Sequence, residues 1–124
     1  MSKKILLVDD AAFMRKMVRD ILTKSGYTDL YEAVDGADAV TKYDEIKPDL
    51  VLMDITMPNM DGLEALKVIR SKDSNANIVM CSAMGQEKMV MDAVKNGVKD
   101  FIVKPFKADR VLKTVTGILG WFKY

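Results

Sequence analysis

Polar side chains that can do chemistry follow four short apolar runs of this sequence. They are Asp9 and Asp10 after residues 5–8, Asp54 at the end of residues 51–54, Ser82 at the end of residues 78–82, and Lys104 after residues 101–103. If the runs that lead to Asp9, Asp10 and Asp54 are neighbouring strands, three carboxylates converge. Carboxylates at such short distances from one another cannot all stay ionised without a cation. Oxygen ligands in an open, hydrated site suit Mg²⁺, which also binds phosphate oxygens.

This set of side chains is suited to phosphoryl transfer. A carboxylate can act as a nucleophile and form an acyl phosphate, while a metal ion and a lysine neutralise the charge that develops on the phosphoryl oxygens. Ser82 adds a hydroxyl donor, and Lys104 adds the fixed positive charge. Asp54 is the better candidate nucleophile, because it stands alone on its run whereas Asp9 and Asp10 can share the metal.

The pattern between these residues predicts the elements that position them. Strands are predicted at residues 5–8, 30–34, 51–54, 78–82 and 101–103, and each is followed by apolar residues at helical spacing. Repeated β-α units with short links predict one doubly wound α/β domain whose parallel sheet is covered on both faces. The mixed polarity of residues 30–34 predicts an edge strand. Because parallel strands share one C-terminal edge, where open α/β sheets bind ligands, the polar residues should meet there.

The last two predicted helices carry more specific expectations. Residues 86–96 form a helix that turns Met89, Val90, Ala93 and Val94 inward and that Gly97 closes. The last helix runs through Phe122, and the aromatic tail of residues 120–124 extends and staples it. The Lys104–Pro105 bond is a place where a cis peptide could fix the direction of the lysine stem, although trans is the commoner state of such bonds.

Composition excludes several classes of protein. The 124 residues fit one domain, and a formal net charge of +1 argues against a generic binder of nucleic acid or of membrane surfaces. With no histidine and one cysteine, a zinc site and an internal disulfide framework are excluded. No run approaches the roughly 20 apolar residues of a membrane span, and the first apolar run is too short for an export signal, so we expect a cytoplasmic protein. Neither glycine-rich nucleotide-binding motif occurs.

Four stretches of the chain resemble the receiver domain of two-component response regulators. They are Val8-Asp9-Asp10, residues 53–62 from Met53-Asp54 to Asp61-Gly62, Ser82-Ala83 and Val103-Lys104-Pro105-Phe106. The resemblance covers nearly the whole chain and is greatest to the stand-alone chemotaxis regulators of the family. It implies a single receiver domain over residues 1–124 with a flavodoxin-like five-stranded sheet in strand order 2-1-3-4-5.

The resemblance also implies roles for the site residues. Asp54 would be the phosphoacceptor, and Mg²⁺ would be held by Asp10, Asp54 and the backbone carbonyl of Thr56, with Asp9 assisting through water. Thr56 stands where the family often has asparagine. Met84, two residues after Ser82, stands where the family often has an acidic residue. Both positions flank the path of the attacking water, so they bear on the lifetime of the phosphoryl group.

Three further residues would respond to phosphorylation of Asp54. Ser82 and Lys104 would contact it, and Phe101 would turn inward as Ser82 moves toward it. The pair Ser82 and Phe101 would then bias a surface made by the fourth helix, the fifth strand and the fifth helix. Phe101 lacks the hydroxyl of the tyrosine that is familiar at this position.

The expected function is that of a monomeric signalling switch and not of an enzyme. A histidine kinase of the CheA type would phosphorylate it, and a motility, motor or adaptor protein would bind its switch surface; a phosphatase is a further candidate partner. The alternatives are a phosphorelay intermediate or phosphate sink without a motor target, a Mg²⁺-dependent aspartyl phosphatase, and a flavodoxin-like binding module. The phosphatase class usually has a second acid where Thr56 stands, and a carboxylate-lined edge repels a flavin phosphate.

Overall fold

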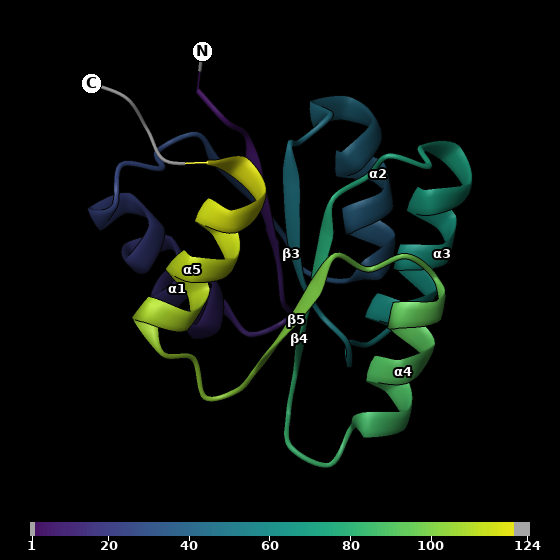
Figure 1. The fold of residues 1–124 in the computed structure, drawn as a ribbon. Helices are drawn as coiled ribbons and strands as arrows, with labels where there is room; N and C mark the ends of the chain where they lie inside the picture. Colours follow the sequence, from purple (N-terminus) through teal and green to yellow (C-terminus); the bar gives the residue numbers. More distant parts are fainter. Residues whose placement is uncertain (1, 121–124) are drawn as a thin grey trace.

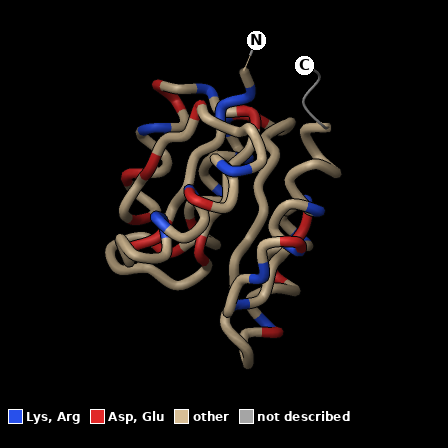
Figure 2. Tube along the Cα trace, turned by 90° about the vertical axis from the view of Figure 1, so that its left-hand side faces the viewer, with Lys and Arg blue, Asp and Glu red and all other residues tan. Residues whose placement is uncertain are grey.

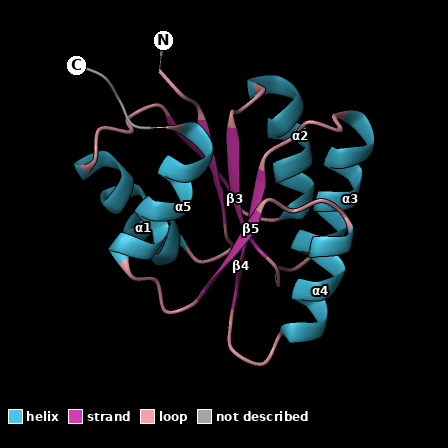
Figure 3. Ribbon diagram, in the orientation of Figure 1, coloured by secondary structure: helices cyan, strands magenta, loops and turns pink. Residues whose placement is uncertain are grey.

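The structure is a computed structural model, and it describes residues 2–120. Strands and helices alternate along the described chain (Figure 1). The elements are β1 (Ile5–Val8), α1 (Ala12–Lys24), β2 (Leu30–Ala33), α2 (Gly36–Ile46), β3 (Leu50–Asp54), α3 (Gly62–Lys72), β4 (Ile78–Ser82), α4 (Glu87–Lys95), β5 (Asp100–Val103) and α5 (Ala108–Leu119). Helices α1 and α5 cover one face of the sheet, and α2, α3 and α4 cover the other (Figure 3).

All strands of the sheet are parallel, and their order is β2-β1-β3-β4-β5. The predicted doubly wound fold and its strand order are therefore confirmed. β2 is an edge strand, as its mixed polarity predicted. β1 pairs with both β2 and β3, and Val8 lies opposite Met53. The residues that follow β1 and those that end β3 therefore reach the same edge of the sheet side by side.

Strands β1, β3 and β4 each contribute to two hydrophobic cores, because successive side chains point to opposite faces. In β1, Ile5 and Leu7 pack toward α1 and α5, whereas Leu6 and Val8 pack toward α2 and α3. β1, β3 and β4 are buried along their full length. This double burial explains why these strands are continuous apolar runs instead of alternating ones.

Helix α4 differs from the prediction in how it faces the sheet. Ala93 is buried, and Met89 and Val90 are partly buried against the core. Val94, which was predicted to point inward, is 52% exposed. The apolar face of α4 is wider than the sheet that it covers, because β5 is the last strand and nothing in the described chain lies beyond it.

Helix α5 is described to Leu119, and Gly120 forms its C-cap at a φ of 80° with its N–H donated to the Thr116 carbonyl. The predicted contribution of the aromatic tail falls on residues 121–124, which lie outside the described residues. Within the described part of the chain, no helix has both the length and the apolar character needed to cross a membrane. Basic and acidic residues are nearly equal in number and are interspersed along the chain (Figure 2).

Candidate functional site

Three carboxylates meet where β1 and β3 end. Asp9, Asp10 and Asp54 each offer an oxygen, and these oxygens all lie within 4.8 Å of one another. Asp9 and Asp54 are buried, whereas Asp10 is exposed. The Asp9 N–H extends the sheet by donating to the Ala33 carbonyl at 3.2 Å, and the Asp9 carboxylate accepts the N–H of Ala11 at 2.9 Å. The predicted convergence of the three acids is confirmed.

Lys104 joins this cluster from the end of β5, the edge strand that lies beyond β4. Its Nζ lies 3.2 Å from an Asp9 oxygen and 3.1 Å from an Asp54 oxygen. The lysine follows β5, so its side chain crosses the end of β4 to reach β3 and β1. Its backbone N–H donates to the Ser82 carbonyl at 2.7 Å, and the peptide bond to Pro105 is cis.

The electrostatics of the cluster favour an additional cation. Burial raises the pKa of Asp54, the neighbouring Asp9 raises it further, and the Lys104 ammonium and the Thr56 N–H oppose the rise without cancelling it. Burial also lowers the pKa of Lys104, but Asp54 and Asp9 outweigh that effect and hold this pKa above its usual value. Lys104 is therefore charged, and one ammonium faces three carboxyl groups.

Cys81 lies beside Asp54 but is not a candidate nucleophile. The two residues are partners in the β3–β4 register, and the cysteine is buried. Burial raises the pKa of its thiol to about 12, so the reactive thiolate is almost absent at neutral pH. Among the side chains at this edge, the carboxylates are therefore better candidate nucleophiles than the Cys81 thiol.

The loop after β3 holds Asp54 close against the start of α3. The Gly62 N–H donates to the Ile55 carbonyl at 2.8 Å, and a Cβ at Gly62 would lie 2.2 Å from the Asp54 carbonyl oxygen. Only glycine permits this approach. Asp61 caps α3 through a capping box with Glu64, which explains why an aspartate precedes Gly62 at the start of this helix.

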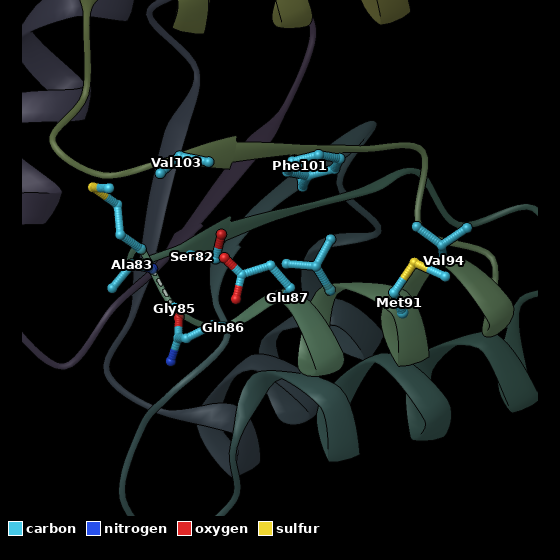
Figure 4. A pocket seen from close by; sticks show the side chains of 11 residues that line it. Ser82, Ala83, Gly85, Gln86, Glu87, Met91, Val94, Phe101 and Val103 are labelled. Atoms are coloured by element: carbon cyan, nitrogen blue, oxygen red, sulfur yellow. Dashed lines mark hydrogen bonds between the residues drawn. The ribbon is translucent and has the colours of Figure 1, made fainter.

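Ser82 and Thr56 lie next to the cluster, and Phe101 does not. Ser82 is the last residue of β4 and is 2% exposed. Thr56 lies in the loop after β3 and donates its N–H to Asp54. Phe101 is 37% exposed on β5, where it lines an apolar groove of about 470 Å³ with residues of α4 such as Met91 and Val94 (Figure 4).

Two residues near the site were not found from the sequence. Arg15 donates to the Asp9 carbonyl at 2.6 Å, and Gln86 accepts from the Ala83 N–H and donates to the Thr56 hydroxyl. Neither has a spacing that marks it in the sequence. The one available signal was that glutamine is an unusual residue at the start of a helix, where Gln86 stands.

Residues 5–116 match the family model described as the response regulator receiver domain. The chain is 60% identical to the chemotaxis protein CheY of Bacillus subtilis, a match that covers 97% of this chain and all of that protein. It is 56% identical to the chemotaxis protein CheY of Thermotoga maritima, over 95% of this chain and 98% of the other.

Solved structures agree with these sequence matches. A CheX–CheY–BeF3–Mg²⁺ complex from Borrelia burgdorferi contains a chain with a TM-score of 0.89 and 40% identity, over 94% of this chain and 89% of that one. The receiver domain of NtrX from Brucella abortus gives a TM-score of 0.88 and 34% identity, over 94% and 98%. The chain therefore belongs to the response regulator receiver family of two-component systems and is a CheY-like member of it.

Proposed function

We propose that this protein is a phosphorylation-dependent switch whose phosphoacceptor is Asp54. The observation that carries the proposal is the bridge that Lys104 makes to Asp54 and Asp9 beside Asp10. This arrangement supports the proposal because a carboxylate, an ammonium group and further oxygen ligands lie together at one edge of the sheet. The phosphoryl donor would be a histidine kinase of the CheA type, since the similar CheY proteins are chemotaxis proteins.

The carboxylate cluster fits Mg²⁺. Its donor set is all oxygen and one of its acids, Asp10, is exposed, which suits a hard cation that keeps part of its water shell. Asp10, Asp54 and the Thr56 carbonyl would hold the ion, and Asp9 would assist through water. When bound, Mg²⁺ would offset the carboxylate charge and that of the incoming phosphoryl oxygens.

The reaction at Asp54 is a transfer between two nucleophiles. A carboxylate oxygen of Asp54 attacks the phosphorus of a phosphohistidine, the P–N bond breaks, and its electron pair stays on the imidazole nitrogen, which takes a proton from solvent. Lys104 moves its hydrogen bonds from the free carboxylate to the phosphoryl oxygens. The Ser82 hydroxyl, which bonds to no other side chain of residues 2–120, donates to the same group.

The output surface in this proposal is the one made by α4, β5 and α5. Phe101 and Val103 of β5 and Met91 and Val94 of α4 are all exposed there although they are apolar. Movement of Ser82 toward the phosphoryl group and of Phe101 inward would change this surface. The partner would be a motility, motor or adaptor protein, and a phosphatase would return the protein to its resting state.

The proposed switch would act as a stand-alone receiver domain. The protein would work in the cytoplasm as a monomer, with residues 1–124 forming one receiver domain. Its own chemistry would be limited to accepting the phosphoryl group and hydrolysing it slowly, so it would not turn over a substrate as an enzyme does. A phosphorelay intermediate or phosphate sink would use the same site but would lack a motor target.

Labelling with a small phosphodonor tests the proposal. Wild-type protein incubated with radiolabelled acetyl phosphate and Mg²⁺ should take up at most one phosphoryl group, in a linkage that hydroxylamine cleaves. Asp54→Asn should abolish the label, whereas Asp20→Asn, which changes an exposed aspartate of α1, should not. Undiminished labelling of Asp54→Asn would reject the assignment, and catalytic turnover of acetyl phosphate at the rate of an ordinary enzyme would favour the phosphatase alternative.

A further inference from the structure

Gln86 occupies the N-cap of α4 but does not cap the helix. Its side chain makes no hydrogen bond to the first turn of α4. Short side chains such as serine, asparagine and aspartate are preferred at N-caps, because they reach the free N–H groups of that turn. Gln86 therefore does not stabilise the first turn of α4, and its side chain makes its hydrogen bonds to other groups.

The carboxamide of Gln86 joins Thr56 and Ala83, which lie in two loops 27 positions apart in the sequence. Its Nε2 donates to the Thr56 hydroxyl at 2.6 Å, and its Oε1 accepts the Ala83 N–H at 2.7 Å. The second bond is drawn in Figure 4, where the Gln86 side chain turns back along the loop toward Ala83. Thr56 follows β3 and Ala83 follows β4, so the glutamine links the two loops that flank Asp54.

The register of β3 and β4 indicates which groups a phosphoryl group on Asp54 would approach. Asp54 pairs with Cys81 in the register of β3 and β4. A phosphoryl group on Asp54 would extend past the end of β3, toward the level of the two residues that follow Cys81, namely Ser82 and Ala83. Its charged oxygens are stronger acceptors than a neutral carboxamide. The backbone donor that Gln86 now occupies is therefore one that a phosphoryl oxygen can compete for.

We propose that Gln86 is a positioning residue that tethers the loop after β4 to Thr56 in the unphosphorylated protein and gives up the Ala83 N–H when Asp54 is phosphorylated. This inference rests on the proposed phosphorylation of Asp54. A bond made only in the resting state stabilises that state relative to the phosphorylated one. Gln86 therefore raises the threshold for switching and holds the loop of Ser82 in place until the phosphoryl group forms.

Beryllofluoride, which was bound in the similar CheX–CheY complex, is the probe for this tether. In the presence of Mg²⁺, Gln86→Ala should bind beryllofluoride about three- to tenfold more tightly than wild type, the equivalent of one net hydrogen bond. Thr56→Val removes the other end of the tether and should shift affinity in the same direction. The double variant should gain less than the sum of the two, because both changes break one linkage. Lys88→Ala, on the exposed face of α4, should bind as wild type does.

The amide resonance of Ala83 provides a readout that a purely structural role of Gln86 would not move. Without beryllofluoride, the Ala83 resonance of Gln86→Ala should differ from that of wild type, because its acceptor is gone. With beryllofluoride and Mg²⁺, the two resonances should agree. Thermal unfolding of each variant shows whether it is folded.

Three results would overturn the inference in distinguishable ways. Unchanged or weaker beryllofluoride binding by folded Gln86→Ala, with normal binding by wild type, would reject the tether alone. An Ala83 resonance that still differs between the two bound proteins would show that Gln86 keeps its bond in the activated state. Wild-type protein that binds no beryllofluoride would overturn the tether and the proposed phosphorylation together.

Discussion

The carboxylate of Asp54 is buried at an electrostatic cost. The residue is 8% exposed, and burial raises its pKa although the Lys104 Nζ lies 3.1 Å from one of its oxygens. A carboxylate with this surrounding is poorly solvated in the resting protein and gains from sharing its charge with a metal ion or from becoming an acyl phosphate. We therefore expect the ionised Asp54 carboxylate to lower the folding stability of the metal-free protein.

Asp54→Asn should make the protein more stable at neutral pH. The folded pKa of Asp54 lies above its unfolded value of 3.8, so the folded state binds more protons in that window and stability is lost as pH rises through it. Without Mg²⁺, the variant should unfold roughly 2–5 °C higher than wild type at pH 7, and this advantage should shrink toward pH 4. Thermal scans at both pH values measure it. A wild-type protein as stable as the variant at pH 7 would contradict the assigned cause of the shift.

Gly62→Ala should damage both the fold and the site. The added Cβ would lie 2.2 Å from the Asp54 carbonyl oxygen, so the loop must move, at a cost of about 1–3 kcal/mol or more. Phosphoryl labelling should fall as well. Gly117→Ala is the matched control, because nothing lies within 4 Å of its Cβ in α5, and it should stabilise by about 0.5–1 kcal/mol. Equal denaturation curves for the two variants would show that the close approach at Gly62 does not matter.

At the scale of single elements, β2 shows how an exposed edge is secured. Glu32 of β2 pairs with Arg15 at 2.7 Å and with Arg19 at 2.9 Å, both from α1. Arg15 also donates to the Asp9 carbonyl, so the same side chain joins α1, the edge strand and the start of the site. The mixed polarity that marked β2 in the sequence is therefore part of how this strand is attached.

Glu32→Gln should destabilise the protein at neutral pH but not at acidic pH. Burial raises the pKa of Glu32, but Arg15 and Arg19 outweigh it and hold this pKa below the usual value of 4.5. Stability from this group is present above that value and is lost as pH falls through the folded pKa. The variant should unfold about 1–4 °C lower at pH 7, and the difference should vanish once the pH falls below the folded pKa of Glu32. A difference that persists unchanged at low pH would point to packing as the cause.

The elements also show what sequence patterns can predict. The buried strands were predictable because a strand covered on both faces is apolar at every position. Helix α4 was harder, because its apolar residues serve both the core and an exposed groove, and Val94 belongs to the second. The same limit applies to β5, where Phe101 and Val103 point away from the core although Ile102 is buried.

At the scale of the whole molecule, one topological fact gathers the site. The first strand, β1, lies inside the sheet between β2 and β3, so Asp9 and Asp54 meet although 45 positions separate them. The pattern of apolar runs predicted parallel strands whose polar ends share one edge. The adjacency of β1 and β3, on which the convergence of the acids depends, came from the family resemblance. The bridge of Gln86 could not, because it depends on the spacing of two loops and on the rotamer of one long side chain.

The most direct test of this account is to locate the phosphoryl group itself. After treatment with acetyl phosphate and Mg²⁺, the acyl phosphate can be reduced with borohydride and the modified residue identified by peptide mass spectrometry. The account predicts a single modified residue, Asp54, and loss of the modification when Mg²⁺ is chelated. Modification of Asp9 or Asp10, or labelling that is unaffected by removal of Mg²⁺, would contradict it.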